Sequence, residues 1–230
     1  DIGVRLVGSE MCIRDSTGAE AVIKALVENG VEVIFGYPGG AVLPLYDAIF
    51  DNKNIKHILV RHEQAAVHAA EGYARSTGKV GCVLVTSGPG ATNAITGLTD
   101  ALMDSIPIIC LSGQVPTHLI GTDAFQEADT TGISRPCTKH NYLVKNADKL
   151  CGIIHESFEI ASTGRPGPVL IDLPKDIQLT RIQYDKKINK TKNKLIKNKS
   201  KIDQKVITKV AELLISAERP IIYGGGGVIN

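Results

Sequence analysis

Glu63 is the residue whose position most suggests chemistry. It stands in Arg61-His62-Glu63-Gln64, between a short apolar run at His57–Val60 and an alanine-rich stretch with helical spacing. A carboxyl group in the first turn of a helix can simply complement the helix dipole. Beyond the end of a parallel strand, the same group would lie in a ligand crevice and could exchange a proton with a bound molecule. The residue types alone leave both interpretations open.

A glycine-rich turn, S-G-P-G-A-T-N, spans Ser87–Asn93 and resembles the phosphate-binding turns found at helix N-termini. It fits neither G-x-G-x-x-G nor the P-loop, and no Lys-Ser/Thr pair follows it. Ser87 is not predicted to be a nucleophile because the G-x-S-x-G pattern is absent. The signal for phosphate binding is therefore weak.

The segment Gly121–Asp129, G-T-D-A-F-Q-E-A-D, combines an aromatic ring, an amide and three acids. A solvated helix start explains most of this composition. The six histidines lack the spacing of a zinc-binding helix, and the five cysteines include no C-x-x-C pair. No metal site or disulfide framework is predicted, and a reducing cytosol fits best.

The spacing of apolar residues predicts an alternation of strands and helices. Thr17 and Glu20 form a predicted capping box for a helix that ends at Asn29-Gly30. The expected strands are 31–35, 57–60, 80–86, 107–112, 142–144 and 168–173, and the further helices are 41–50, 63–77, 91–103 and 147–163. Apolar strands separated by helices predict an α/β fold, a parallel six-stranded sheet with helices on both faces. Ligands then belong in the loops after Phe35, Val60 and Thr86.

The chain is expected to divide into four parts. Residues 1–16 have no clear period, contain the adapter-like string V-G-S-E-M-C-I-R-D-S and are interpreted as a non-native leader. Residues 17–179 form the main domain, 180–204 a lysine-rich linker, and 205–230 the truncated start of a second α/β domain. In that last part Val206, Val210, Leu213 and Leu214 share a helical face, and Pro220–Tyr223 reads as a strand running into Gly224–Gly227.

Charge and hydropathy exclude some classes of function. The 230 residues carry a net charge of +2, and no apolar run reaches the roughly 18 residues that span a bilayer. Between Arg181 and Lys205, nine lysines and one arginine face two aspartates, a local charge of +8. A basic arm could bind polyanions, but no aromatic residue is interleaved for base stacking, so a solvated linker is favoured over nucleic-acid binding.

Several segments occur together in an order typical of one family. They are Thr17–Gly30, V-E-V-I-F-G-Y-P-G-G, R-H-E-Q-A-A-V-H-A-A-E-G-Y-A-R, S-G-P-G-A-T-N, G-T-D-A-F-Q-E-A-D and G-R-P-G-P-V-L-I-D-L-P-K-D. The chain resembles the N-terminal, pyrimidine-binding part of acetolactate synthase (acetohydroxyacid synthase) catalytic subunits, which are thiamine diphosphate enzymes. The resemblance is close over Thr17–Leu179 and looser over 220–227.

The resemblance implies roles for particular residues. Glu63 would be the catalytic glutamate that hydrogen-bonds N1′ of the aminopyrimidine ring. The other implied positions are Tyr37, Pro38, Gly39 and Gly40 facing the cofactor, Phe125 and Gln126 lining the substrate side, Lys175 at the substrate channel, Pro116 and Ala41 on the channel wall, and Arg165 contacting FAD.

The resemblance also implies the whole enzyme's activity. Pyruvate would be decarboxylated on thiamine diphosphate and condensed with a second 2-ketoacid, pyruvate or 2-ketobutyrate, in branched-chain amino-acid synthesis. FAD would be bound without net redox use, and Mg²⁺ would be held by a G-D-G…N motif, which this chain lacks. A bacterial, cytoplasmic homodimer or higher homo-oligomer with its active site between subunits is implied, with a possible regulatory small subunit. The fragment is expected to be inactive alone.

Two other interpretations stay open. Another thiamine diphosphate enzyme, such as a pyruvate oxidase, glyoxylate carboligase or 2-ketoacid decarboxylase, would share Glu63 and the S-G-P-G turn, whereas Phe125-Gln126 with Lys175 favours the synthase. A non-catalytic binding module on a flavodoxin-like sheet would use Glu63 only at the start of a helix. Such a module need not bind thiamine diphosphate at all.

Overall fold

Six parallel strands form the centre of the first of two units in the chain, Asp1–Lys190 and Thr191–Asn230. The structure is a computed structural model that describes residues 14–184 and 203–228. The strands are β2 (Val33–Gly36), β3 (Lys56–Leu59), β4 (Gly81–Val85), β5 (Ile108–Gln114), β6 (His140–Leu143) and β7 (Val169–Pro174). Their order across the sheet is β3-β2-β4-β5-β7-β6, and every neighbouring pair is parallel. The predicted six-stranded parallel sheet is confirmed.

The strand order reverses direction between β2 and β4. From β2 the chain moves to β3 on one side, and then returns past β2 to β4 on the other side. The loops that follow β2 and β4 therefore leave the sheet toward opposite faces. Such a switch point opens a crevice at the carboxyl ends of the strands, where ligands of doubly wound sheets bind.

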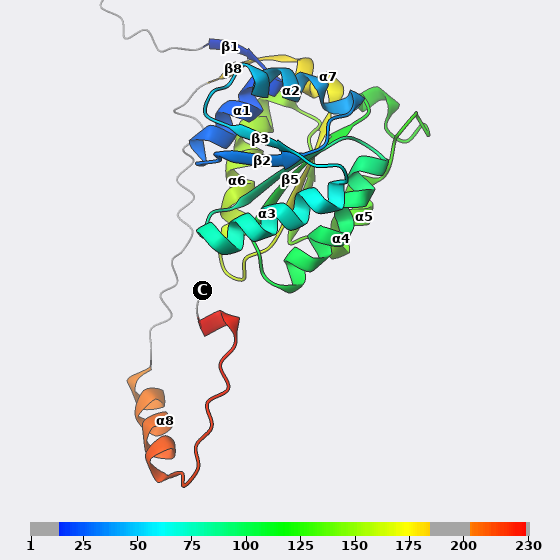
Figure 1. The fold of residues 1–230 in the computed structure, drawn as a ribbon. Coiled ribbons are helices and arrows are strands. Elements are labelled where there is room, and N and C mark those ends of the chain that lie inside the picture. The colour runs from blue at the N-terminus through cyan, green and yellow to red at the C-terminus, as the bar shows by residue number, and fades with distance from the viewer. Residues whose placement is uncertain (1–13, 185–202, 229–230) are drawn as a thin grey trace, which may run out of the picture. The chain divides into compact units, whose positions relative to one another are not determined.

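Helices cover both faces of the sheet (Figure 1). One face carries α1 (Gly18–Glu28), α2 (Leu43–Phe50) and α6 (Leu150–Ser162), and the other carries α3 (Glu63–Thr77) and α4 (Pro89–Met103). Successive residues of a strand point to opposite faces, so Leu84 joins the first core and Val83 the second. All residues of β4, β5 and β7 are buried, which explains their nearly continuous apolar runs.

The capping box at the start of α1 is confirmed. The Thr17 hydroxyl accepts from Glu20 N at 3.2 Å, and the Glu20 carboxylate accepts from Thr17 N at 2.9 Å. Each side chain thereby satisfies a backbone N–H that the first helical turn would leave unpaired.

Two short strands extend the first unit beyond its expected limits. β1 (Arg14–Thr17) and β8 (Arg181–Tyr184) pair antiparallel, so strand structure includes residues 14–16 of the expected leader and 181–184 of the expected linker. The rest of the expected leader, and 185–202 of the lysine-rich linker, lie outside the described residues. Short helices α5 (Thr130–Ser134) and α7 (Lys175–Leu179) complete this unit, with 3-10 turns at 40–42, 117–119, 135–137 and 147–149.

The second unit is described over residues 203–228. Its helix α8 (Gln204–Ser216) agrees with the predicted helical spacing, and a 3-10 turn covers Gly226–Val228. The expected strand at Pro220–Tyr223 is wrong, because these residues are irregular and Tyr223 is fully exposed. A strand needs a neighbour for its backbone hydrogen bonds, and the described part of this unit supplies none. No helix within 14–184 or 203–228 has both the length and the apolar character required to cross a membrane.

Close approach of α3 and α4 gives a testable prediction. A Cβ on Gly97 of α4 would lie 2.5 Å from Cβ of Val67 on α3. We expect Gly97→Ala to lower the free energy of unfolding by about 1–3 kcal/mol, since overpacking outweighs the better helix propensity of alanine. The matched control is Gly152→Ala in α6, where nothing lies within 4 Å of the new Cβ. Urea unfolding should show a gain of up to about 1 kcal/mol for the control, and equal stability changes in the two variants would contradict the prediction.

Candidate functional site

Glycines of the two loops at the switch point pack on one side chain, that of Thr86. A Cβ on Gly39, in the loop after β2, would lie 2.5 Å from the Thr86 side chain, and a Cβ on Gly90 would lie 2.7 Å from Thr86 Cγ2. Thr86 follows β4 and is buried, and its hydroxyl has no hydrogen-bond partner in the described part of the chain. Both glycines therefore let the chain pack directly on Thr86, and its unsatisfied hydroxyl is left beside main chain at this end of the sheet.

Glu63 is the first residue of α3 and lies buried, 7% exposed, at the same edge of the sheet. Asn93 of α4 donates from Nδ2 to Glu63 Oε2 at 2.9 Å. The other oxygen, Oε1, lies 3.3 Å from where a Cβ on Gly90 would stand. The N-cap hydrogen bond of α3 comes from the His62 ring, whose Nδ1 accepts from Gln64 N at 3.2 Å. Glu63 is thus not the cap of its helix, and its carboxyl group lies between Asn93 and Gly90.

Residues 121–129, here called the 121–129 loop, reach the crevice from β5. A Cβ on Gly88 would lie 2.6 Å from the carbonyl oxygen of Gln126. Both residues have positive φ, 56° for Gly88 and 58° for Gln126, a conformation that costs a non-glycine residue energy. The structure therefore brings Gln126 to the S-G-P-G turn, while the Phe125 side chain is 88% exposed beside it.

The carboxylate of Glu127 closes the 121–129 loop on itself. It accepts from Gly121 N through Oε1 and from Ala124 N through Oε2, the latter at 3.0 Å. The backbone donor of Gly121 above all lowers the pKa of Glu127, because these hydrogen bonds favour the ionised form. Glu127 therefore acts inside the loop, and the neighbouring Phe125 and Gln126 are left free to face outward.

Three further expected residues lie at the same edge of the sheet. Lys175 begins α7 directly after β7, and Pro116 precedes a 3-10 turn after β5. Ala41 packs on the end of β5, since a Cβ on Gly113 would lie 2.9 Å from the Cβ of Ala41. Lys175 is half-buried and forms no ion pair with the described residues. A cation without a counter-ion at this edge is suited to attracting an anionic substrate.

Arg165 lies at the opposite edge of the sheet. It precedes strand β7, whereas Lys175 follows the same strand. Its Nε donates to Ser105 Oγ at 2.8 Å, and its Nη2 donates to the carbonyls of Leu102 and Met103 at 3.0 and 2.9 Å. These bonds satisfy carbonyl groups around the C-terminal end of α4. The structure gives Arg165 this structural role, and a contact with FAD stays a prediction.

A buried polar network on β5 and β7 was not predicted from the sequence. Ser112 Oγ donates to Asp172 Oδ1 at 2.7 Å, and Gln114 Nε2 donates to Asp172 Oδ2 at 2.9 Å. All three side chains are at least 98% buried. Burial raises the pKa of Asp172 to about 7. The available signal was a polar residue interrupting each apolar strand, in C-L-S-G-Q and in L-I-D-L.

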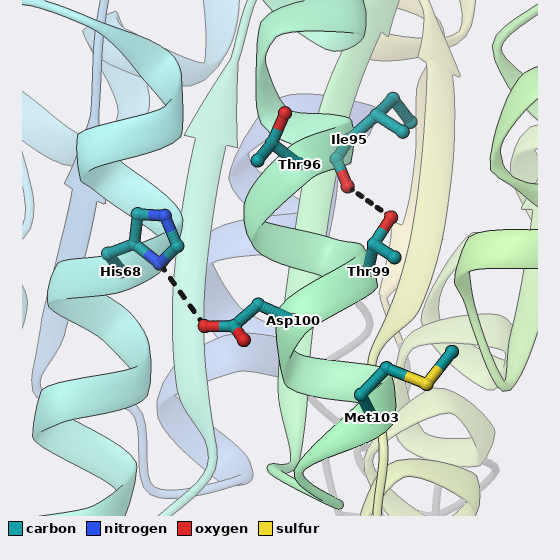
Figure 2. A pocket seen from close by; sticks show the side chains of 6 residues that line it. All are labelled: His68, Ile95, Thr96, Thr99, Asp100 and Met103. Atoms are coloured by element: carbon teal, nitrogen blue, oxygen red, sulfur yellow. Dashed lines mark hydrogen bonds and ion pairs between the residues drawn. The ribbon is translucent and has the colours of Figure 1, made fainter.

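His68 of α3 and Asp100 of α4 line an open hollow of about 650 Å³ (Figure 2), and Glu71 lies beside them. His68 Nδ1 lies 3.1 Å from Glu71 Oε2 and 3.7 Å from Asp100 Oδ2. Burial raises the pKa of Glu71, and its Oε1 has no partner in the described residues. Sequence spacing could not reveal this group, because Asp100 comes from a different helix. The contacts between His68, Glu71 and Asp100 explain why these side chains lie together, and the group is more than one helical turn along α3 from Glu63.

Comparison with known proteins gives consistent matches. Residues 16–133 match the family described as "Thiamine pyrophosphate enzyme, N-terminal TPP binding domain". The chain is 56% identical over 222 residues to the acetolactate synthase large subunit of Buchnera aphidicola subsp. Schizaphis graminum. It is 54% identical over 215 residues to that of Haemophilus influenzae, and 51% identical over 215 residues to the isozyme 3 large subunit of Escherichia coli. Each match covers 93% of this chain, which spans about 38% of the length of each relative.

The buried Asp172 predicts a pH dependence of stability. The pKa of Asp172 is about 7 in the folded chain, whereas the pKa of an aspartate in an unfolded chain is about 4. The stability that the neutral acid contributes is complete below about pH 4 and is lost as the pH rises to about 7, by at most about 4 kcal/mol. Asp172→Asn keeps a neutral group of the same shape, so we expect its excess stability over the wild type to grow across this window. Parallel urea-unfolding profiles of the two proteins from pH 4.5 to 8 would contradict this.

Proposed function

The chain belongs to the thiamine pyrophosphate enzymes, as their N-terminal TPP-binding domain, and we propose from this that its switch-point crevice holds the aminopyrimidine ring of thiamine diphosphate. The observation that carries the proposal is the buried Glu63 carboxyl group beside Gly90, at the carboxyl ends of the strands where such sheets bind ligands. The whole protein is then an acetolactate synthase, which joins two 2-ketoacids after decarboxylating the first. Relatives at 51–56% identity that carry this name support the assignment.

The residues of the crevice fit the cofactor's pyrimidine ring. A flat aromatic ring needs main-chain surface beside it, and Gly40, where a Cβ would meet nothing within 4 Å, leaves such surface open. Ring nitrogens and amino groups need polar partners, and the crevice offers the Glu63 carboxyl group and the unsatisfied Thr86 hydroxyl. Tyr37 and Pro38 belong to the loop that carries Gly39.

Glu63 would hold or release one proton at a ring nitrogen. Bound thiamine diphosphate supplies the carbanion chemistry that decarboxylation requires. Asn93 donates to Oε2 of Glu63, so it fixes the carboxyl group and leaves Oε1 for the ligand. A carboxyl group can exchange a proton at this point, whereas an amide of the same shape cannot.

The substrate side is assigned to residues at the same edge of the sheet. Gln126 has an amide that can donate to an oxygen of a 2-ketoacid, and the exposed Phe125 ring can pack on the reacting fragment. Lys175, without a counter-ion in the described chain, would attract the carboxylate of the incoming acid. Ala41 and Pro116 would form the wall of the approach.

The other partners follow from the same assignment. Mg²⁺ and the diphosphate would be held by a G-D-G…N motif that is absent from this sequence. FAD would be contacted by Arg165, although most hydrogen-bond donors of Arg165 are already used. A homo-oligomer with sites between subunits, a regulatory small subunit such as the term large subunit suggests, and a cytoplasmic location complete the proposal.

Glu63→Gln tests the role of the carboxyl group. In the complete enzyme we expect exchange of the C2 proton of thiamine diphosphate, followed by NMR, to slow by about 10²–10⁴-fold. The matched control is Glu71→Gln, the same change at another buried position of α3. Near-normal exchange in Glu63→Gln, or equal losses in both variants, would refute the assigned role.

The product tests the proposed reaction. The complete protein, supplied with pyruvate, thiamine diphosphate, Mg²⁺ and FAD, should form acetolactate as its main product. Acetaldehyde as the main product would indicate a decarboxylase, and hydrogen peroxide an oxidase.

A further inference from the structure

Both ends of the 121–129 loop border a cavity. The cavity has a volume of about 290 Å³, and its lining includes Gly121, Ala128, Gln114 and Asp172. Two non-glycine residues of the loop have positive φ, Asp123 at 57° and Gln126 at 58°. Such strained conformations persist only where surrounding contacts determine them. Polar contacts must therefore hold this loop in place.

One side chain supplies the anchor at the C-terminal end of the loop. Gln114 Nε2 donates to the carbonyl oxygen of Ala128 at 2.9 Å. The orientation of the amide is fixed, because its Oε1 accepts from Val115 N at 2.9 Å. The second proton of Nε2 goes to Asp172 Oδ2, and Ser112 donates to Oδ1 of the same carboxyl group. Every polar atom of the Gln114 amide is thereby used, in a buried setting where unpaired groups are costly.

The register of the sheet explains why these residues meet. Ser112 of β5 is directly paired with Asp172 of β7, and Gln114 stands two residues further on the same face. That face carries Cys110 and Leu170 in the core beneath α3 and α4. Toward the carboxyl end of these strands the apolar positions give way to polar ones. The change occurs where the strands lie under the 121–129 loop.

We propose that Asp172 is a positioning residue, which acts through Gln114 to hold the 121–129 loop so that Phe125 and Gln126 stand at the crevice. The role toward substrate rests on the proposed function. The anchoring itself rests on the hydrogen bonds from Ser112 through Asp172 and Gln114 to Ala128. A bond from Thr117 N to Asp176 Oδ1, at 3.0 Å, holds the segment that leads into the loop.

Hydrogen exchange on the complete protein tests the anchoring independently of activity. Gln114→Met and Asp172→Leu remove the bonds at similar side-chain size, and we expect exchange of the amides at 121–129 to become about tenfold faster. Asp172→Asn keeps an acceptor for Gln114 and can donate to Ser112, so it should retain protection within about threefold. The control is Ser157→Ala in α6, a fully buried hydroxyl bonded to Ile153 O, which should leave the loop unchanged.

Steady-state kinetics on the same variants test the link to substrate. Gln114→Met should raise KM for the 2-ketoacid by about tenfold, with a smaller change in kcat. The affinity for thiamine diphosphate should stay within about twofold, because Glu63 and Asn93 lie on other elements. Asp172→Asn should have a KM for the 2-ketoacid close to the wild-type value.

The outcomes separate the two proposals. Unchanged loop exchange in Gln114→Met, or equal acceleration in the loop and in α6, overturns the anchoring. Loop amides that exchange as fast in Asp172→Asn as in Asp172→Leu also overturn it. If Asp172→Leu does not fold, Asp172→Asn is compared with Gln114→Met instead, and equal loop exchange in those two variants overturns the anchoring. A wild-type protein that forms no acetolactate overturns the proposed function, while the exchange data still decide the anchoring.

Discussion

The candidate site depends on how closely two backbone segments approach each other at the sheet's switch point. Gly39 and Gly90 both stand where a Cβ would collide with Thr86, so the loops can pack this closely only because these positions carry no side chain. The strand order makes this meeting unavoidable, since β2 and β4 are neighbours whose loops turn to opposite faces. Glu63 joins them because β3 lies on the other side of β2 and ends at the same edge. The buried carboxyl group thus follows from topology as much as from residue type.

Sequence patterns were sufficient for most of the fold. Helix α3 begins and ends where the spacing predicts, and the capping box at Thr17 is present. The strands follow the apolar runs to within a few residues, because burial on both faces requires continuous hydrophobic sequence. The strand predicted at Pro220–Tyr223 is wrong for a related reason. An apolar β-branched run becomes a strand only beside a partner, and a local pattern carries no information about its partner.

The side-chain contacts of the site could not be predicted from the sequence pattern. The residues that resemblance assigned, from Tyr37 to Lys175, do lie at one edge of the sheet, whereas Arg165 lies at the other. The bonds from Asn93 to Glu63 and from Gln114 to Ala128 join elements far apart in the chain, and composition cannot supply such distances. The same holds for Asp172, whose neighbours on β5 are set by strand register. Polar residues inside otherwise apolar strands nevertheless indicate from sequence alone that buried hydrogen bonds are present.

The antiparallel pair β1–β8 places residues 14–17 beside residues 181–184. A unit whose two ends lie together can be excised, inserted into another polypeptide or circularly permuted with only a short connecting segment. Glu63, the 121–129 loop and Lys175 all lie within the stretch enclosed by this pair. Segments that flank this pair can therefore be exchanged without displacing the strands and loops that carry these residues.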